Sequence, residues 1–266
     1  IDTVSPQRPT MDLVTPHDTG ASNLDNVTRQ ANQVDFTVTA DAGTTVHVKD
    51  GNTILVTYVS TGVDTVSLTL AEGTHLVSAE SVDAAGNISH QSEELVVTID
   101  RTAPGATVPG LAATSDTGLA GDRITSISDP AFVGRAEANA KVRVFAGGVL
   151  VGEGVVNSDE SDGQLGDGLG LWEITVEPLA DGVYQITTEV EDLAGNISAP
   201  LEVPLVITID TVSPQRPTMD LVTPHDTGAS NLDNVTRQAN PVQFTVTADV
   251  GTTVHVKDGN TILVTY

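Results

Sequence analysis

The C-terminal part of this chain repeats its N-terminal part almost letter for letter. Residues 209–266 match residues 1–58 at 55 of 58 positions. The three differences are Gln33 to Pro241, Asp35 to Gln243 and Ala42 to Val250. Repetition at a fixed period is the signature of an array, in which one structural unit is multiplied. An enzyme usually needs one unique site, so we expect a piece of a longer tandem array rather than a catalyst.

An older repeat lies inside this period, because three short markers recur in the same order. An Ile-Asp-x-x-x-Pro segment begins at Ile1, Ile99 and Ile209. The triplet Asp-Thr-Gly begins at Asp18, Asp116 and Asp226, and Asp-x-Ala-Gly-Asn-Ile-Ser begins at Asp83 and Asp192. Units of about 100 residues are a common domain size. The markers therefore predict one domain at residues 1–100, a second at 101–209 and the N-terminal half of a third at 210–266.

The local pattern predicts β-strands throughout. Apolar and polar residues alternate over residues 34–40, as a half-buried strand requires, and similar runs follow at 46–48, 53–58, 66–70, 75–82 and 95–99. The turn Asp50-Gly51 between two such runs is a strong hairpin signal. About seven short strands per unit with regular turns predict tandem immunoglobulin-like β-sandwiches, arranged end to end as a rod. Tyr184 falls where such sandwiches carry a tyrosine corner, and His75 takes that place in the first unit.

The charge of the chain limits its partners. Thirty-six acidic residues face eleven basic ones, which gives a formal net charge of −25. Nucleic acid and anionic membrane surfaces both require a basic surface, so we expect neither as a partner. The chain has no cysteine, so no disulfide staples its domains, and a bound metal can take over that role. Without an apolar run of membrane-spanning length, we expect no membrane insertion by this segment.

The ordered markers resemble a known family. The series Ile-Asp-x-x-x-Pro, Asp-Thr-Gly, Asp-Gly-Val-Tyr and Asp-x-Ala-Gly-Asn is similar to the bacterial immunoglobulin-like repeats of giant RTX and biofilm-associated adhesins. Those adhesins belong to Gram-negative bacteria and include the extender region of an ice-binding adhesin. The resemblance implies an extracellular, calcium-rigidified, monomeric stalk on the bacterial cell surface, which projects a distal adhesive domain. Its partners would be calcium ions and the neighbouring repeats.

Carboxylates gather where the topology brings consecutive domains together. The B–C and F–G loops of a sandwich lie at its N-terminal end, and the A–B and E–F loops lie at its C-terminal end. At the first junction we expect oxygen ligands from Asp18, Asp25, Asp100, Glu137, Asp192 and Asn196. At the second we expect them from Asp116, Asp122, Asp210 and Asp249, and a terminal half-site from Asp2, Asp41, Asp83 and Asn87. Calcium takes six to eight such oxygens in a flexible geometry, so these sets predict calcium sites.

Other interpretations of the same residues stay open. Asp, Asn and Gly are also ordinary turn residues, so each loop can be a loop and nothing more. The second domain carries an acidic, glycine-rich insertion near residues 157–168, in which Asp159, Asp162 and Asp167 form either a further calcium loop or a solvated loop. The insertion lacks the closing Glu of an EF-hand.

The catalytic interpretations are weak, whereas a direct binding role remains an alternative. Asp-Thr-Gly is also the aspartic-protease signature, but such proteases need two carboxylates sharing one proton. Here the copies lie about 100 residues apart on separate domains. The alternative to a spacer is that the modules themselves bind a glycan, a surface or a partner cell. Exposed aromatic residues would favour that alternative, and only 3% of this chain is aromatic.

Overall fold

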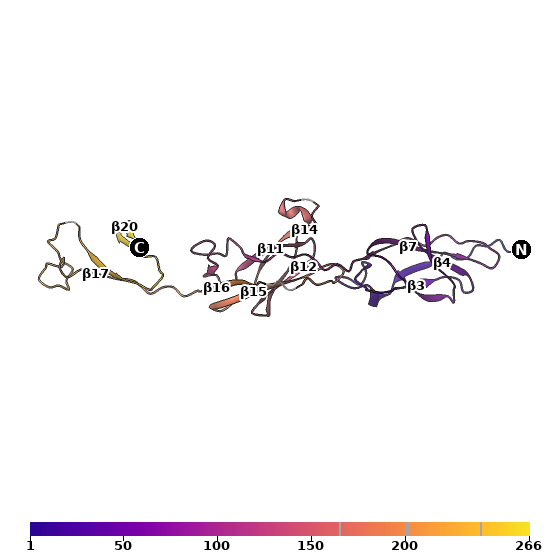
Figure 1. Cartoon of the computed structure of the whole chain (residues 1–266), viewed down its shortest axis with the longest axis horizontal. Helices are drawn as coiled ribbons and strands as arrows, with labels where there is room; N and C mark the ends of the chain where they lie inside the picture. Colours follow the sequence, from indigo (N-terminus) through magenta and orange to yellow (C-terminus); the bar gives the residue numbers. More distant parts are fainter. Residues whose placement is uncertain (165, 200–202, 240) are drawn as a thin grey trace. The chain divides into compact units, whose positions relative to one another are not determined.

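The computed structural model describes residues 1–164, 166–199, 203–239 and 241–266, and these fall into two compact units. The first unit spans Ile1–Asp210 and contains two β-sandwiches, which we call domain one and domain two. The second unit spans Thr211–Tyr266. In Figure 1 domain one carries the labels β3, β4 and β7, and domain two carries β11, β12 and β15. The architecture is all-β, as the alternating pattern predicts.

Domain one consists of two facing sheets. The first has the order β1-β3-β6 and contains β1 (Thr10–Leu13), β3 (Val34–Thr39) and β6 (Val63–Leu68). The second has the order β2-β8-β7-β4-β5 and contains β2 (Val27–Thr28), β4 (Thr45–Asp50), β5 (Thr53–Val59), β7 (Gly73–Val82) and β8 (Leu95–Ile99). The N-terminal strand is divided in two, since β1 pairs antiparallel with β3 whereas β2 pairs parallel with β8. This division gives eight strands where the sequence predicts about seven.

Domain two repeats this topology strand for strand. One sheet has the order β14-β11-β9, from β9 (Gly110–Leu111), β11 (Ala131–Glu137) and β14 (Leu169–Thr175). The other has the order β10-β16-β15-β12-β13, from β10 (Ile124–Thr125), β12 (Lys141–Ala146), β13 (Val149–Val155), β15 (Gly182–Glu191) and β16 (Leu205–Ile209). The shared topology places the same loops at the same end of each domain.

Each domain has its own core, formed by the inward-facing residues of both sheets. Phe36 in β3 and Phe132 in β11 are fully buried at corresponding places. Trp172 is buried and packs in the core of domain two. Its indole lies over Gly134, where a β-carbon would come within 2.5 Å of the ring. The only helices among the described residues are the short η1 (Thr15–His17) and η2 (Asp159–Asp162). None of them has the length and apolar character needed to cross a membrane.

The turn before β15 confirms the predicted tyrosine corner. The Tyr184 hydroxyl donates a hydrogen bond of 3.0 Å to the carbonyl oxygen of Ala180. In domain one, His75 makes the corresponding contact, with Nε2 3.0 Å from the Ala71 carbonyl oxygen. Its other ring nitrogen lies 2.7 Å from Asp50 Oδ2. The imidazole therefore replaces the phenol at this corner and adds a link to the β4–β5 turn.

The second unit shows the apolar surface that a half-sandwich leaves open. It contains two hairpin-like pairs, β17 (Thr218–Leu221) with β18 (Phe244–Thr247) and β19 (His255–Asp258) with β20 (Thr261–Thr265). Phe244 is 47% exposed, whereas its counterpart Phe36 is fully buried. In domain one β6 pairs with β3 and β7 pairs with β4, and residues 211–266 contain no copy of β6 or β7. The exposure of Phe244 follows from these missing strands, because neither sheet is complete enough to cover the other.

Candidate metal centre at the domain junction

Three carboxylates from three separate segments meet where domain one passes into domain two. Asp100 follows β8 directly, Glu137 ends β11, and Asp192 follows β15. Each offers an oxygen, and these oxygens all lie within 4.8 Å of one another. Asp192 is buried, and the other two side chains are partly exposed. The sequence analysis placed these residues at one junction because of their loops, and the structure brings them together.

The F–G turn of domain two holds Asp192 in place through its own hydrogen bonds. The backbone N–H and the side-chain amide of Asn196 each donate to the Asp192 carboxylate, both at 2.8 Å. The same amide also donates to the carbonyl oxygen of Asp100, at 2.9 Å. Asn196 therefore connects Asp100, which lies in the linker between the two domains, to the turn that holds Asp192. Its side-chain nitrogen is the donor in both hydrogen bonds. Only the side-chain amide oxygen of Asn196 could therefore act as a metal ligand.

The electrostatics of this group are those of an uncompensated negative cluster. Burial raises the pKa of Glu137, and the charges of Asp192 and Asp100 raise it further. Burial also raises the pKa of Asp100, against a hydrogen bond from the Thr102 N–H, and the Asp192 charge adds to the rise. Among the described residues, no ion pair with a basic side chain reaches any of the three carboxylates. A cation is the natural counter-charge for such a group.

A fourth carboxylate, Glu72, borders this cluster and was missed by the sequence analysis. Glu72 lies in the turn before β7, and its Oε1 accepts hydrogen bonds from the Arg101 N–H at 2.8 Å and the Thr102 hydroxyl at 3.2 Å. The Arg101 N–H lowers the pKa of Glu72, and a side-chain contact links Glu72 to Asp100. The only sequence signal for Glu72 was its position in the E–F turn, between β6 and β7, because this turn lies at the end of domain one that adjoins domain two.

Asp18 and Asp25 belong to a separate site in residues 14–26, which lie between β1 and β2 within the divided N-terminal strand and which we call the A–B loop. They do not join the group of three described above. Burial raises the pKa of Asp18, the Asn26 N–H lowers it, and the neighbouring Asp25 charge raises it again. Asp18 is only 7% exposed, and its Oδ1 is buried without a hydrogen-bond partner. The corresponding Oδ1 atoms of Asp116 and Asp226 are buried and unpartnered as well.

The remaining predicted ligands occupy ordinary turn geometries. In domain one, Asp83 and Asn87 reproduce the Asp192–Asn196 turn, with the Asn87 amide 3.3 Å from the Asp2 carbonyl oxygen. Asp41 Oδ2 instead accepts the Gln7 N–H at 2.7 Å. Within the described residues, these side chains form no cluster comparable to the one at Asp100. Of the second-junction set, Asp116 and Asp122 accept backbone N–H groups from their own loop, from Gly121 and Ile124. Asp249 accepts the N–H of Gln215, as Asp41 accepts that of Gln7. Asp210 donates its N–H to Thr125.

The acidic insertion of domain two is partly closed by an ion pair. Asp167 Oδ2 lies 2.7 Å from Arg135 Nη2, and Asp159 accepts the Gly166 N–H at 2.6 Å. The side chain of Asp162 lies outside the described residues, as does Leu165. Asp167 already has a cationic partner, whereas the Oδ1 of Asp159 is buried without a hydrogen-bond partner, so the loop is only partly neutralised.

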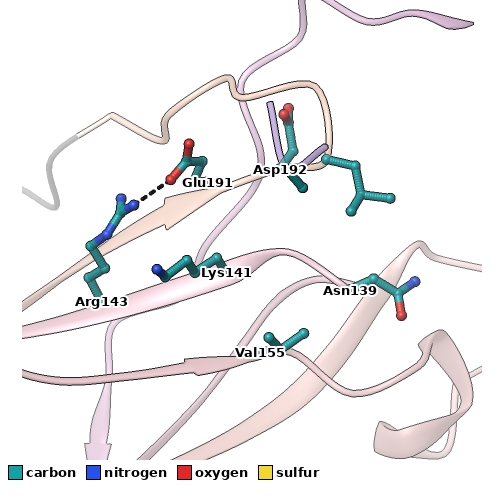
Figure 2. A pocket seen from close by; sticks show the side chains of 8 residues that line it. Asn139, Lys141, Arg143, Val155, Glu191 and Asp192 are labelled. Atoms are coloured by element: carbon teal, nitrogen blue, oxygen red, sulfur yellow. Dashed lines mark hydrogen bonds and ion pairs between the residues drawn. The ribbon is translucent and has the colours of Figure 1, made fainter. Parts of the chain in front are cut away.

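A pocket of about 480 Å³ opens beside the junction (Figure 2). Figure 2 shows Lys141, Arg143 and Glu191 along its wall, with Arg143 Nη2 2.6 Å from Glu191 Oε2. Arg143 also pairs with Glu189 at 2.7 Å, so its charge is already matched. None of the eight lining residues is aromatic. This pocket therefore gives no support to the alternative in which the modules bind a glycan by stacking.

The donor set fits a hard divalent cation. Its ligands are carboxylate oxygens from three separate segments, and neither cysteine nor histidine takes part. Calcium prefers oxygen ligands at about 2.3–2.6 Å and tolerates irregular geometry, whereas zinc prefers nitrogen and sulphur. The buried, unpartnered Oδ1 of Asp18 meets the same requirement in the A–B loop.

Comparison with known proteins gives one family match. Residues 3–101 and 102–211 each match the family model described as "Bacterial Ig-like domain". No protein with a curated description matches the chain.

Several solved structures are similar at low sequence identity. The fibronectin(III)-like modules of Clostridium thermocellum CbhA are 13% identical over 75% of this chain and 94% of theirs, with a TM-score of 0.38. The BSP domain of a biofilm associated protein is 17% identical over 70% of this chain and 29% of its own, with a TM-score of 0.26. The ligand-binding domain of human OSCAR is 11% identical over 78% of this chain and 100% of its own, with a TM-score of 0.36.

Proposed function

The chain belongs to the bacterial Ig-like domain family, and on this premise we propose that it is an extender segment of a bacterial cell-surface adhesin. In this role the tandem domains add length and carry a distal adhesive domain away from the cell. Near-identity of the copies supports the proposal, because an array of interchangeable units serves length better than it serves a unique binding site. Ig-like domains are typically structural or binding modules, and we propose no enzymatic activity.

We further propose that calcium stiffens the joints of this array. The observation that carries the proposal is the group of Asp100, Glu137 and Asp192, whose oxygens lie within 4.8 Å without a described basic partner. Three carboxylates so placed repel one another, and a divalent cation converts the repulsion into attraction. Asp100 comes from the linker between the two domains, Glu137 from the end of β11, and Asp192 from the turn between β15 and β16. An ion held by all three would therefore restrain the linker against domain two.

Glu72 extends this clamp to domain one. Because it contacts Arg101, Thr102 and Asp100, it can align the linker and add an oxygen to the ion's surroundings. We assign a second, weaker cation position to Asp18 and Asp25 of the A–B loop, on the strength of the buried Oδ1 of Asp18. With only two carboxylates, that position needs backbone or water oxygens to complete a calcium shell.

Small-angle scattering of the whole chain, in calcium and then in chelator, tests the proposal. We expect calcium to reduce flexibility between the domains and to raise the melting temperature, because an ion bound only to the native state stabilises it by mass action. Equal stability and equal flexibility in chelator would exclude the clamp. A compact particle in calcium, with the domains folded back on one another, would exclude the spacer role.

A further inference from the structure

The Asp-Thr-Gly loop of domain one touches domain two directly, without any carboxylate. The Ala21 N–H donates to the carbonyl oxygen of Leu193 at 3.1 Å. The Thr19 hydroxyl donates to the carbonyl oxygen of Ala194 at 2.9 Å. Both acceptors belong to the Ala-Gly turn between β15 and β16, which we define as residues 193–195. The A–B loop of one domain is thus hydrogen-bonded to the F–G turn of the next.

Thr19 is oriented for this contact by its own loop. Its Oγ1 accepts the Arg29 N–H at 3.0 Å, which leaves the hydroxyl proton free to point at Ala194. A carbonyl at the tip of a turn has lone pairs available, so the bond replaces a water contact with a directional protein contact. The hydroxyl therefore serves as a prepared donor at the surface of domain one.

Gly20 permits the close approach of the two backbones. A β-carbon at Gly20 would lie 2.2 Å from the Leu193 carbonyl oxygen and 2.6 Å from the Ala194 carbonyl carbon. From the other side, a β-carbon at Gly195 would lie 3.0 Å from the Gly20 Cα. Both glycines also have positive φ, at 111° and 88°. Two facing glycines therefore form a contact that no larger residue could make in this geometry.

We propose that the Thr-Gly pair of the A–B loop is a docking site for the Ala-Gly turn of the domain that follows it. The joint is separate from the calcium clamp, since its atoms are a hydroxyl, two carbonyl oxygens and a backbone N–H. The joint holds domain one and domain two in a fixed relative orientation when no ion is bound. It also gives the two repeated markers complementary roles, with Thr-Gly as the receiving half and Ala-Gly as the inserted half.

The copies of each half have matching geometry. In domain two the Ser126 N–H donates to Thr117 Oγ1 at 2.8 Å, as Arg29 does to Thr19, and Gly118 has a φ of 81°. In domain one the Ala-Gly turn ends at Gly86, whose φ of 89° equals that of Gly195 within a degree. A β-carbon at Gly118 or Gly86 would meet nothing within 4 Å. By this proposal, Thr117 and Gly118 are a second copy of the receiving half, and the turn that ends at Gly86 is a second copy of the inserted half.

These copies supply matched controls for a test on the whole chain. Gly20→Ala and Gly118→Ala impose a similar backbone strain, because both positions have positive φ, but only Gly20 faces a neighbouring domain. Gly195→Ala and Gly86→Ala form the reciprocal pair. The chain has no cysteine, so Asn52→Cys and Val149→Cys place two unique spin labels, one on the exposed β4–β5 turn of domain one and one on the exposed first residue of β13 in domain two. The distance distribution between the labels is measured by pulsed electron paramagnetic resonance in chelator.

We expect a narrow distance distribution for the unsubstituted chain and for Gly118→Ala, and loss of the narrow peak for Gly20→Ala and Gly195→Ala. Equal widths for Gly20→Ala and Gly118→Ala would overturn the joint. So would a distribution in chelator that is already broad before any substitution. If an alanine variant does not fold, Thr19→Val against Thr117→Val provides the same comparison without a clash. Because calcium is absent throughout, failure of the clamp does not affect this result, and failure of the joint leaves the clamp to be tested by scattering.

Discussion

Replacing Glu137 by Gln should change the stability of domain two in opposite directions, depending on calcium. The substitution keeps the shape of the side chain and removes one of three charges that lie within 4.8 Å of one another. In chelator the two remaining carboxylates repel each other alone, so the variant should be more stable than the original chain. In calcium the variant lacks one charged ligand, so the ion should add less to the free energy of unfolding than it adds in the original chain.

The expected magnitudes follow from the geometry. Two unit charges about 4.8 Å apart interact by about 1 kcal/mol in a water-like medium and by about 3.5 kcal/mol at an effective dielectric constant of 20. Because Glu137 and Asp100 are partly exposed, we use the lower figure for each of the two pairs removed, about 2 kcal/mol in total. For a domain of about 100 residues, that corresponds to a rise of about 8–16 °C in the melting temperature of domain two.

The calcium contribution should fall as the affinity falls. At a free calcium concentration 100 times the dissociation constant, the ion stabilises the native state by about 2.7 kcal/mol. A tenfold loss of affinity at the same concentration reduces this contribution to about 1.4 kcal/mol. Loss of one charged oxygen ligand should weaken binding at least this much, because ligand charge sets calcium affinity.

Differential scanning calorimetry in chelator and in calcium measures both changes on one protein. Glu177→Gln is the control, because Glu177 is an exposed carboxylate of domain two outside the cluster. The control should move the melting temperature little in either condition. An unchanged or lower melting temperature for Glu137→Gln in chelator would show that the cluster is not repulsive. An unchanged calcium increment would show that Glu137 is not a ligand.

Three further changes have defined outcomes. Calcium binding should weaken as the pH falls through the raised pKa values of Asp100 and Glu137, because the ion must displace the protons that these carboxylates then hold. Calcium titrations at a series of pH values from 4 to 8 measure the affinity, and an affinity independent of pH over that whole range would contradict the prediction. Burial lowers the pKa of His75, but the hydrogen bonds to Asp50 and to the Ala71 carbonyl oxygen raise this pKa overall. Protonated His75 therefore stabilises domain one fully below pH 6.5, and this stabilisation is lost as the pH rises through the folded-state pKa. His75→Tyr should remove this pH dependence from the melting temperature of domain one. Gly134→Ala should lower the free energy of unfolding of domain two by about 1–3 kcal/mol, because the added methyl group would overpack against Trp172. Trp172 is the only tryptophan, so its fluorescence measures denaturant unfolding of this domain directly, and an unaltered unfolding midpoint would refute the contact.

The fold could be predicted from the sequence because its signals are local and repeated. The predicted runs at 34–40, 53–58 and 95–99 differ from β3, β5 and β8 by at most one residue at an end. Alternation with a period of two shows which face is buried, and the Asp-Gly turn sets the hairpin. What alternation does not show is the division of the first strand between two sheets. That division depends on which strand edge, β3 or β8, each short segment reaches.

The candidate site could be predicted only in part. Topology alone places the linker, the B–C loop and the F–G loop at one end of a domain, so Asp100, Glu137 and Asp192 were predicted together. Asp18 was assigned to the same junction but lies in a site of its own, because its carboxylate turns back to the Asn26 N–H within the A–B loop. Glu72 was missed because a single carboxylate in a turn carries no distinguishing pattern.

The docking joint had no signal of its own, because its acceptors are backbone carbonyl oxygens. Any residue supplies such an oxygen, so the partner of Thr19 cannot be inferred from side-chain types. The repeated Thr-Gly pair is the sequence feature that corresponds to the joint. A turn alone accounts equally well for a glycine with positive φ, and only the distance to the neighbouring domain separates the two explanations.

One turn of domain two takes part in both proposed contacts. Asp192 faces the carboxylate cluster, and the next two residues present their carbonyl oxygens to domain one. An ion that orders Asp192 also orders the turn that the Thr-Gly pair receives, and docking of that turn holds Asp192 in place for the ion. Binding energies linked in this way are reciprocal, so each contact strengthens the other by the same factor. Two individually weak contacts can therefore hold a joint that neither would hold alone, which suits an array whose units are small and lack disulfides.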